Sequence, residues 1–116
     1  MSLSKWTCKP PTAGDTPFSP AQGEQMGREV RNWSWEDASI KKEFRFKDFR
    51  EAMVFVNKVA EVAQEQGHHP DILITYKTVR LTLTTHKIGG LSKNDFIMAA
   101  RIDQLLTSPP FGEANR

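Results

Sequence analysis

The chain has 116 residues, a length that suits one compact domain and is too short for two substantial ones. Its residues are 38% hydrophobic and 26% charged, as in ordinary soluble domains, and its apolar runs fall short of the roughly 20 residues needed to span a bilayer. With 16 basic and 14 acidic residues, the net charge of +2 is too small and too dispersed to favour direct binding of nucleic acid.

Residues 1–18 contain three prolines and show little apolar periodicity, so we expect an extended or flexible N-terminal arm outside the core. The start of this arm lacks the apolar stretch of a secretory signal. Cys8 is the only cysteine of the chain and can form no internal disulfide. These features favour a reducing, cytoplasmic setting and no role in a membrane.

A helix is predicted from Pro20 to about Val30, because Ser19 at the N-cap and Gln22 at N3 have the spacing of a capping box. Two internal glycines each weaken this helix by about 0.8 to 1 kcal/mol relative to Ala. Its docking on the rest of the domain must therefore supply the difference.

Residues 32–46 alternate between apolar and polar side chains, which predicts a short strand and then a longer one, with a turn at 36–38. From Asp48 the apolar residues instead recur at steps of three and four as far as Ala63. This change of period predicts a long amphipathic helix, with Gly67 as its terminator. Its expected core residues include Phe49 and Phe55.

Two runs rich in β-branched residues follow, Ile72 to Tyr76 and Val79 to Thr85. Only residues 77–78 separate them, so a tight antiparallel hairpin is predicted. Alternate residues of the second run are aliphatic and face the core. The intervening polar residues face away, and His86 joins them if the strand continues that far.

Gly89 and its neighbouring glycine break the chain after the hairpin. Ser92 and Asp95 then have capping-box spacing, which predicts a last helix running to about Leu106. Residues 108–116 form a polar C-terminal tail in this interpretation.

The predicted order is helix, two strands, helix, two strands, helix. This order describes an α+β domain over residues 19–107, with a four-stranded antiparallel sheet and helices packed on one face. The other face and the sheet edges need cover, and small sheets commonly obtain it by pairing across a two-fold axis. We therefore expect a homodimer or homotetramer.

All three histidines lie on or beside this hairpin: His68 and His69 precede it with Pro70, and His86 follows it. Histidine is the one side chain whose unperturbed pKa lies near neutrality, so a group of imidazoles can give and take protons at physiological pH. The cluster therefore predicts an active site that handles protons.

Several stretches of the chain match one family in order and spacing. They are 44–49 (Phe-Arg-Phe-Lys-Asp-Phe), 68–70 (His-His-Pro), Tyr76, 79–86 (Val-Arg-Leu-Thr-Leu-Thr-Thr-His), 90–92 (Gly-Leu-Ser) and Asp95. From about Ser19 to Leu106 the chain resembles the pterin-4a-carbinolamine dehydratases, known in animals as dimerisation cofactors of a hepatocyte nuclear homeodomain factor. The resemblance implies a four-stranded antiparallel sheet with helices on one side, and dimers or tetramers.

It also implies an activity: dehydration of a 4a-hydroxytetrahydropterin to the quinonoid dihydropterin. This is the pterin-recycling step that follows aromatic amino-acid hydroxylation, so a functional link to such a hydroxylase is expected. The pterin is the substrate, and neither a metal nor an organic cofactor is implied.

By the family pattern His68, His69 and His86 line the site with Asp95. We expect His68 and His86 to transfer protons and His69 to hold the pterin ring. Asp95 could serve as a helix cap, as a catalytic group, or as both. The residues expected to contact substrate are Thr84, Thr85 and Pro70, although strand structure explains the threonines and a helix-to-strand stop explains the proline equally well.

Two positions depart from the family pattern: Gln64 stands where an acidic residue is common, and Ile72 where an aromatic one is frequent. A zinc site is the first alternative, but adjacent imidazoles such as His68 and His69 do not readily bind one ion together. The second alternative is a non-catalytic binding or assembly partner, or a transcription coactivator, with the same fold.

Overall fold

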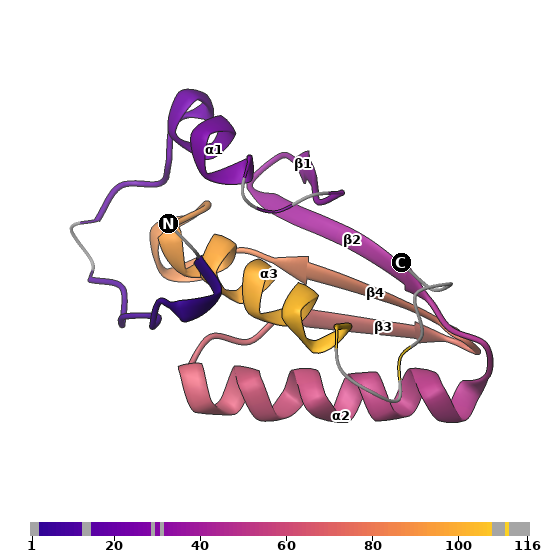
Figure 1. The fold of residues 1–116 in the computed structure, drawn as a ribbon. Helices are drawn as coiled ribbons and strands as arrows, with labels where there is room; N and C mark the ends of the chain where they lie inside the picture. Colours follow the sequence, from indigo (N-terminus) through magenta and orange to yellow (C-terminus); the bar gives the residue numbers. More distant parts are fainter. Residues whose placement is uncertain (1–2, 13–14, 29, 31, 108–110, 112–116) are drawn as a thin grey trace.

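The computed structural model describes residues 3–12, 15–28, 30, 32–107 and 111, and it has the predicted α+β architecture (Figure 1). The elements in chain order are η1 (Leu3–Lys5), α1 (Pro20–Gly27), β1 (Ser34–Glu36), β2 (Ser39–Arg45), α2 (Phe49–Gln66), β3 (Asp71–Thr75), β4 (Thr78–Leu83), η2 (His86–Ile88) and α3 (Lys93–Leu105). The two short 3-10 segments, η1 and η2, are additions to the predicted order. Within the described ranges, no helix is both long and apolar enough to span a bilayer.

The four strands form one antiparallel sheet in the order β1-β2-β4-β3. Ile40 pairs with Leu83 and Phe44 with Val79, and all four side chains are buried on one face. Helices α2 and α3 contact β4 and cover that face (Figure 1). The predicted alternation therefore separates a helix-covered face from an open, polar one.

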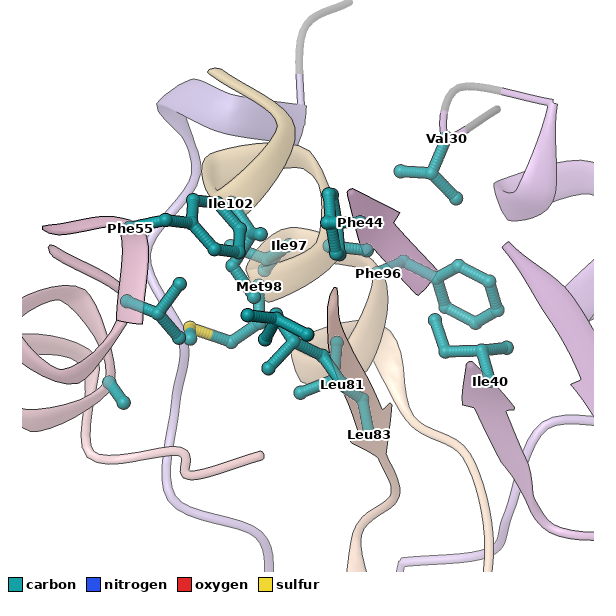
Figure 2. Close-up of a cluster of buried hydrophobic side chains, with 14 of the residues drawn as sticks. Val30, Ile40, Phe44, Phe55, Leu81, Leu83, Phe96, Ile97, Met98 and Ile102 are labelled. Carbon is teal, nitrogen blue, oxygen red and sulfur yellow. The ribbon is translucent and has the colours of Figure 1, made fainter. Parts of the chain in front are cut away.

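The core lies between α2, α3 and the covered face of the sheet (Figure 2). Phe55 is fully buried and packs against Phe44 with ring centroids 4.8 Å apart. Phe49, predicted as its core partner, is 50% exposed. The prediction for Phe49 is wrong because the buried stripe of α2 begins at Glu51 and Ala52, one turn further along the helix.

The helix starts follow the capping rules. Ser19 makes the predicted capping box with Gln22, although α1 ends at Gly27, before the expected Val30. Asp48 accepts a hydrogen bond from the Glu51 backbone N–H at 2.8 Å and so begins α2. At the other end of α2, Gly67 has a φ of 67°, a left-handed conformation that favours glycine and stops the helix as predicted.

The hairpin turn lies one residue earlier than predicted. Thr75 pairs with Thr78, so Tyr76 and Lys77 form the turn, and Tyr76 has a φ of 53°. Strand β4 ends at Leu83, two residues before the predicted end.

Strand β3 is an exposed edge of the sheet. All five of its residues are exposed, including Ile72 (38%), Leu73 (50%) and Ile74 (36%). An edge strand presents backbone N–H and C=O groups that can pair with another chain. Its aliphatic side chains make β3 a candidate surface for association.

The N-terminal arm is largely extended, but it is packed on the domain. Leu3 (3% exposed) and Cys8 (8% exposed) are buried, so our expectation that the arm lies outside the core is wrong for these residues. Phe18 stacks on Phe96 of α3 with ring centroids 6.0 Å apart. The predicted polar tail, 108–116, lies outside the described residues except for Phe111, which packs against the core and is 8% exposed.

A polar cluster ties the end of α3 to the sheet. Asp103 accepts hydrogen bonds from Lys42 Nζ at 2.8 Å and from Trp33 Nε1 at 3.1 Å. Burial raises the pKa of Asp103, and these two hydrogen bonds oppose the rise. The cluster therefore fixes Trp33 and β2 against α3 at some cost in desolvation.

Candidate active site

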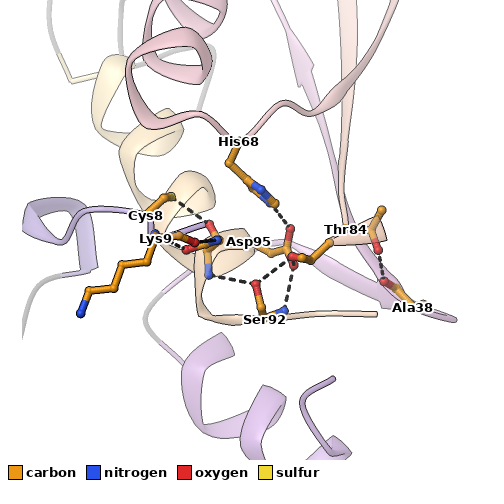
Figure 3. A network of polar contacts seen from close by, with 9 residues as sticks. Cys8, Lys9, Ala38, His68, Thr84, Ser92 and Asp95 are labelled. Carbon is orange, nitrogen blue, oxygen red and sulfur yellow. Dashed lines mark hydrogen bonds and ion pairs between the residues drawn. The ribbon is translucent and has the colours of Figure 1, made fainter. Parts of the chain in front are cut away.

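His68 and Asp95 form a close, buried pair. His68 Nε2 lies 2.6 Å from Asp95 Oδ1 (Figure 3), and His68 as a whole is only 9% exposed. The backbone N–H of His68 donates to the Ala63 carbonyl at 3.2 Å, which continues the hydrogen bonding of α2 past Gly67. The end of α2 therefore holds the imidazole over the first turn of α3.

Asp95 is fully buried, and both of its carboxylate oxygens are bonded. Oδ1 faces His68, while Oδ2 accepts from the Ser92 backbone N–H at 2.9 Å and from Thr85 Oγ1 at 2.8 Å. The Ser92 bond completes the capping box predicted from the sequence. Asp95 thus caps α3 and contacts an imidazole at the same time.

Three segments distant in the sequence meet at this carboxylate: His68 after α2, Thr85 after β4 and the start of α3. Thr85 forms a backbone bridge with Gly90, which closes the loop containing η2. Its hydroxyl also lies 2.7 Å from Ser92 Oγ. Among the described residues, buried side-chain nitrogens and oxygens all have hydrogen-bond partners. The network is therefore fully satisfied and should be rigid.

His69 is exposed and lies beside the pair. Its Nε2 is 3.1 Å from Gln64 Oε1, on the last turns of α2. The position that departs from the family pattern therefore contacts His69. An amide oxygen there can accept from the imidazole N–H and fix the orientation of the ring.

His86 is also exposed, and it begins η2 directly after Thr85. The sequence allowed His86 to extend the predicted strand, but β4 ends at Leu83 and Thr85 instead forms a bridge with Gly90. Gly89, with a φ of 71°, closes the short 3-10 turn. The loop presents His86 next to the residue that anchors Asp95.

The three predicted substrate contacts have different environments. Thr84 Oγ1 donates to the Ala38 carbonyl at 2.6 Å, so its hydroxyl joins β4 to the β1–β2 turn. Thr85 is 2% exposed, and its hydroxyl belongs to the Asp95 network. Pro70 is half-buried between His69 and β3. The observed hydroxyl bonds support the structural interpretation of both threonines, and a contact between these three residues and substrate stays a prediction.

The pair can support acid–base chemistry. When His68 Nε2 carries a proton, it donates to Asp95, and a neutral ring then has an unprotonated Nδ1 that can accept a proton from another molecule. Ser92, which bonds to Thr85 and starts the cap, was found from its spacing to Asp95, but only as a helix signal. Among described residues, no three His, Cys, Asp or Glu side chains are grouped so that they could hold a metal ion.

A cavity of about 570 Å³ lies at the N-terminus of α3. Its walls come from the N-terminal arm, Ile88 and the first turn of α3, including Trp6, Phe18 and Lys93. His68, His69 and His86 are not among the residues that line it. The candidate site is therefore the polar network around Asp95, which brings His68 and the neighbouring histidines together, and not this cavity.

Comparison with known proteins places these residues in context. Residues 16–105 match the sequence profile of the pterin 4 alpha carbinolamine dehydratase family. A protein of Halorhodospira halophila, provisionally named pterin-4-alpha-carbinolamine dehydratase, is 47% identical over 107 residues, which cover 90% of this chain and 98% of the relative. A protein of Nitrosospira multiformis with the same provisional name is 44% identical over 103 residues, covering 89% and 91%.

Two solved structures share the fold. The transcriptional coactivator/pterin dehydratase of Brucella melitensis superposes with a TM-score of 0.74 at 28% identity, covering 78% of this chain and 98% of that one. A pterin dehydratase-like protein described as a RuBisCO assembly factor of the alpha-carboxysome superposes with a TM-score of 0.56 at 26% identity, covering 67% and 93%.

Proposed function

Because this chain belongs to the pterin-4-alpha-carbinolamine dehydratase family, we propose that it removes water from a 4a-hydroxytetrahydropterin to give the quinonoid dihydropterin. The observation that carries the proposal is the buried His68–Asp95 contact of 2.6 Å, flanked in the chain by His69 and His86. Such a group supplies both a base and an acid near neutral pH.

The reaction requires two proton movements and no change of oxidation state. The N5–H proton is removed, the N5 electron pair forms a double bond to C4a, and the C4a–O bond breaks as the hydroxyl takes up a proton and leaves as water. The proton removed and the proton added balance. General acid and base groups are therefore sufficient, and the proposed reaction needs no cofactor besides its pterin substrate.

His68 is proposed as one of the two proton-transfer groups. Its imidazole is held by a carboxylate that is fully buried and bonded on both oxygens. Asp95 has no exposed surface with which to touch a substrate, so it acts through His68. We therefore assign Asp95 as a positioning residue that fixes the orientation of the His68 ring.

His86 is proposed as the second proton-transfer group, and His69 as the group that holds the pterin ring. Both imidazoles are exposed, so a substrate can reach them directly. Gln64 Oε1 orients His69 from α2 at 3.1 Å. Around them Thr84, Thr85 and Pro70 would contribute backbone or ring surface, because the two hydroxyls already have protein partners.

The direct test is turnover of a 4a-hydroxypterin generated in situ by a coupled aromatic amino-acid hydroxylase. We expect His68→Ala and His86→Ala each to lower kcat by about 10² to 10⁴-fold, the usual contribution of a general acid or base. Lys87→Ala is the matched control, because Lys87 is exposed beside His86 in η2. Near-normal rates in both histidine variants would overturn the assignment.

A non-catalytic role is the second candidate, since one structural relative is described as an assembly factor and another as a transcriptional coactivator. The exposed edge strand β3 is a surface through which such a protein could bind a partner. Absence of any rate enhancement by the wild-type protein would favour this role over dehydration.

We further propose that the protein is cytoplasmic, forms a homodimer or homotetramer, and serves an aromatic amino-acid hydroxylase. The exposed aliphatic side chains of β3 support self-association. The net charge of +2 offers no support for direct binding of nucleic acid.

A further inference from the structure

Two consecutive residues of the N-terminal arm bind side-chain amides of the domain. The Cys8 backbone N–H donates to Gln66 Oε1 at 2.9 Å. The Lys9 backbone N–H donates to Asn94 Oδ1 at 3.0 Å, and Asn94 Nδ2 donates back to the Lys9 carbonyl at 2.6 Å (Figure 3). We call these three hydrogen bonds the arm clip.

The arm clip joins the two segments that carry the His68–Asp95 pair. Gln66 is the last residue of α2 and lies two residues before His68. Asn94 directly precedes Asp95 in the first turn of α3. One short piece of extended backbone thus spans the end of one helix and the start of another.

The clip is partly buried, and the arm is anchored on both sides of it. Asn94 and Cys8 are each 8% exposed, and Cys8 Sγ lies 3.7 Å from the Asn94 carbonyl. Before the clip, the Arg101 guanidinium donates to the Trp6 carbonyl at 3.0 and 2.6 Å. After it, the Phe18 N–H donates to the Leu91 carbonyl at 2.7 Å.

We propose that Gln66 and Asn94 are positioning residues, and that through them the N-terminal arm sets the approach of Asp95 to His68. The inference rests on the proposed function only where it predicts a rate. A hydrogen bond as short as that of the pair depends on the separation of two helix termini, and a misplacement of about 1 Å in a catalytic group can lower a rate about 10²-fold. The arm fixes that separation.

The chain contains its own probe of arm docking. Cys8 is the only cysteine, and burial raises the pKa of its thiol to about 11, so it reacts slowly while the arm is docked. We expect Asn94→Ala and Gln66→Met each to raise the rate of Cys8 alkylation about tenfold, because Asn94→Ala removes two hydrogen bonds of the clip and Gln66→Met removes the third. Gln66→Glu keeps an acceptor for the Cys8 N–H and should restore slow labelling.

Separate measurements report the effect of the same substitutions on the His68–Asp95 pair. Ring nitrogen chemical shifts of His68 report its tautomer and hydrogen bonding, and they should move toward those of the Asp95→Asn variant in Asn94→Ala and Gln66→Met. Turnover in the same variants should show kcat about tenfold lower with KM changed less. Val56→Ala is the control for general destabilisation, since Val56 is a buried residue on α2 ten residues before Gln66. It should leave the His68 shifts and kcat near the wild-type values.

Each other outcome has a defined meaning. Faster labelling with unchanged His68 shifts and kcat would show that the arm merely covers the domain, and would overturn the proposal. Unchanged labelling in both clip variants would overturn it too, because the bonds would not then hold the arm. If the wild-type protein shows no turnover, the dehydratase proposal fails, whereas labelling and His68 shifts still decide the role of the arm.

Discussion

Asp95 and His68 are joined at 2.6 Å by the same carboxylate group that closes the first turn of α3 through the Ser92 N–H at 2.9 Å. A helix cap and an imidazole contact therefore depend on one buried side chain. Oδ1 contacts His68 and Oδ2 caps α3, so substitutions can separate the two roles.

Asp95→Asn should keep the cap and damage the imidazole contact. The amide oxygen can take the place of Oδ2 and accept from Ser92 and Thr85, but its NH₂ group then faces His68 Nε2 and can only donate. This stabilises the wrong tautomer of His68 for proton acceptance, so we expect kcat to fall about 10² to 10⁴-fold with little loss of thermal stability. Steady-state kinetics and thermal unfolding of one sample measure both effects.

Ser92→Ala is the counterpart, since it removes the hydroxyl that accepts from the Asn94 N–H but leaves the carboxylate in place. It should lower the free energy of unfolding by about 1 kcal/mol, the usual worth of an N-cap, and change kcat less than Asp95→Asn does. Equal losses of kcat in the two variants would show that the cap alone matters.

The stability of the protein should fall in alkaline solution through Cys8. Burial raises the pKa of this thiol from 9.0 to about 11. As the pH rises from about 9, the unfolded chain releases the Cys8 proton first, so the contribution of the neutral thiol to stability declines and is lost above about pH 11. In denaturant titrations, the free energy of unfolding of the wild type should fall relative to that of Cys8→Ala as the pH rises over this range. A difference independent of pH would contradict the prediction.

Gly23 and Gly27 should respond oppositely to alanine. A Cβ at Gly23 would overlap the Trp35 ring, whereas a Cβ at Gly27 meets nothing within 4 Å. Gly23→Ala should therefore destabilise the protein by about 1 to 3 kcal/mol through overpacking. Gly27→Ala should stabilise it by up to about 1 kcal/mol, because Ala has the higher helix propensity. Chemical denaturation measures both, and stabilisation by Gly23→Ala would show that Trp35 does not hold α1 in place.

Two matched substitutions, one on each edge strand of the sheet, test whether the protein associates through β3. Leu73 lies opposite Arg80 on the open face of the sheet, and Ser34 lies opposite Lys41 on the other edge strand, β1. Leu73→Glu and Ser34→Glu therefore each place a carboxylate across from a cation at an edge. We expect Leu73→Glu to weaken association at least about tenfold, because it removes apolar contact and buries a charge. Sedimentation should show a lower mass for Leu73→Glu alone; equal masses would exclude β3 from the interface.

Local signals made much of the fold predictable from the sequence. Capping residues placed the starts of α1 and α3, because a cap is read from residues three positions apart. The change of period at Asp48 separated the strands from the long helix. Phe49 was misplaced because periodicity does not show where the buried stripe of a helix begins, and in α2 that stripe begins at Glu51 and Ala52.

An unusual backbone conformation and the contacts between distant segments were not predictable. The hairpin turn lies one residue earlier than predicted because Tyr76 adopts a left-handed conformation, which a tyrosine rarely takes. The arm clip joins residues 58 and 85 positions apart, and its partners on the arm are backbone atoms, which leave no trace in the sequence. The residue types at the candidate site could be named, but their arrangement around Asp95 depends on three separate segments meeting.

Because the arm contributes only backbone atoms to the clip, Lys9 should be replaceable by residues other than proline. Proline has no backbone N–H and would remove the hydrogen bond that Asn94 Oδ1 accepts. Related sequences could then differ freely along much of the arm while keeping amides at the positions of Gln66 and Asn94. An engineer who adds an affinity tag or fusion partner to this protein has reason to prefer the other terminus.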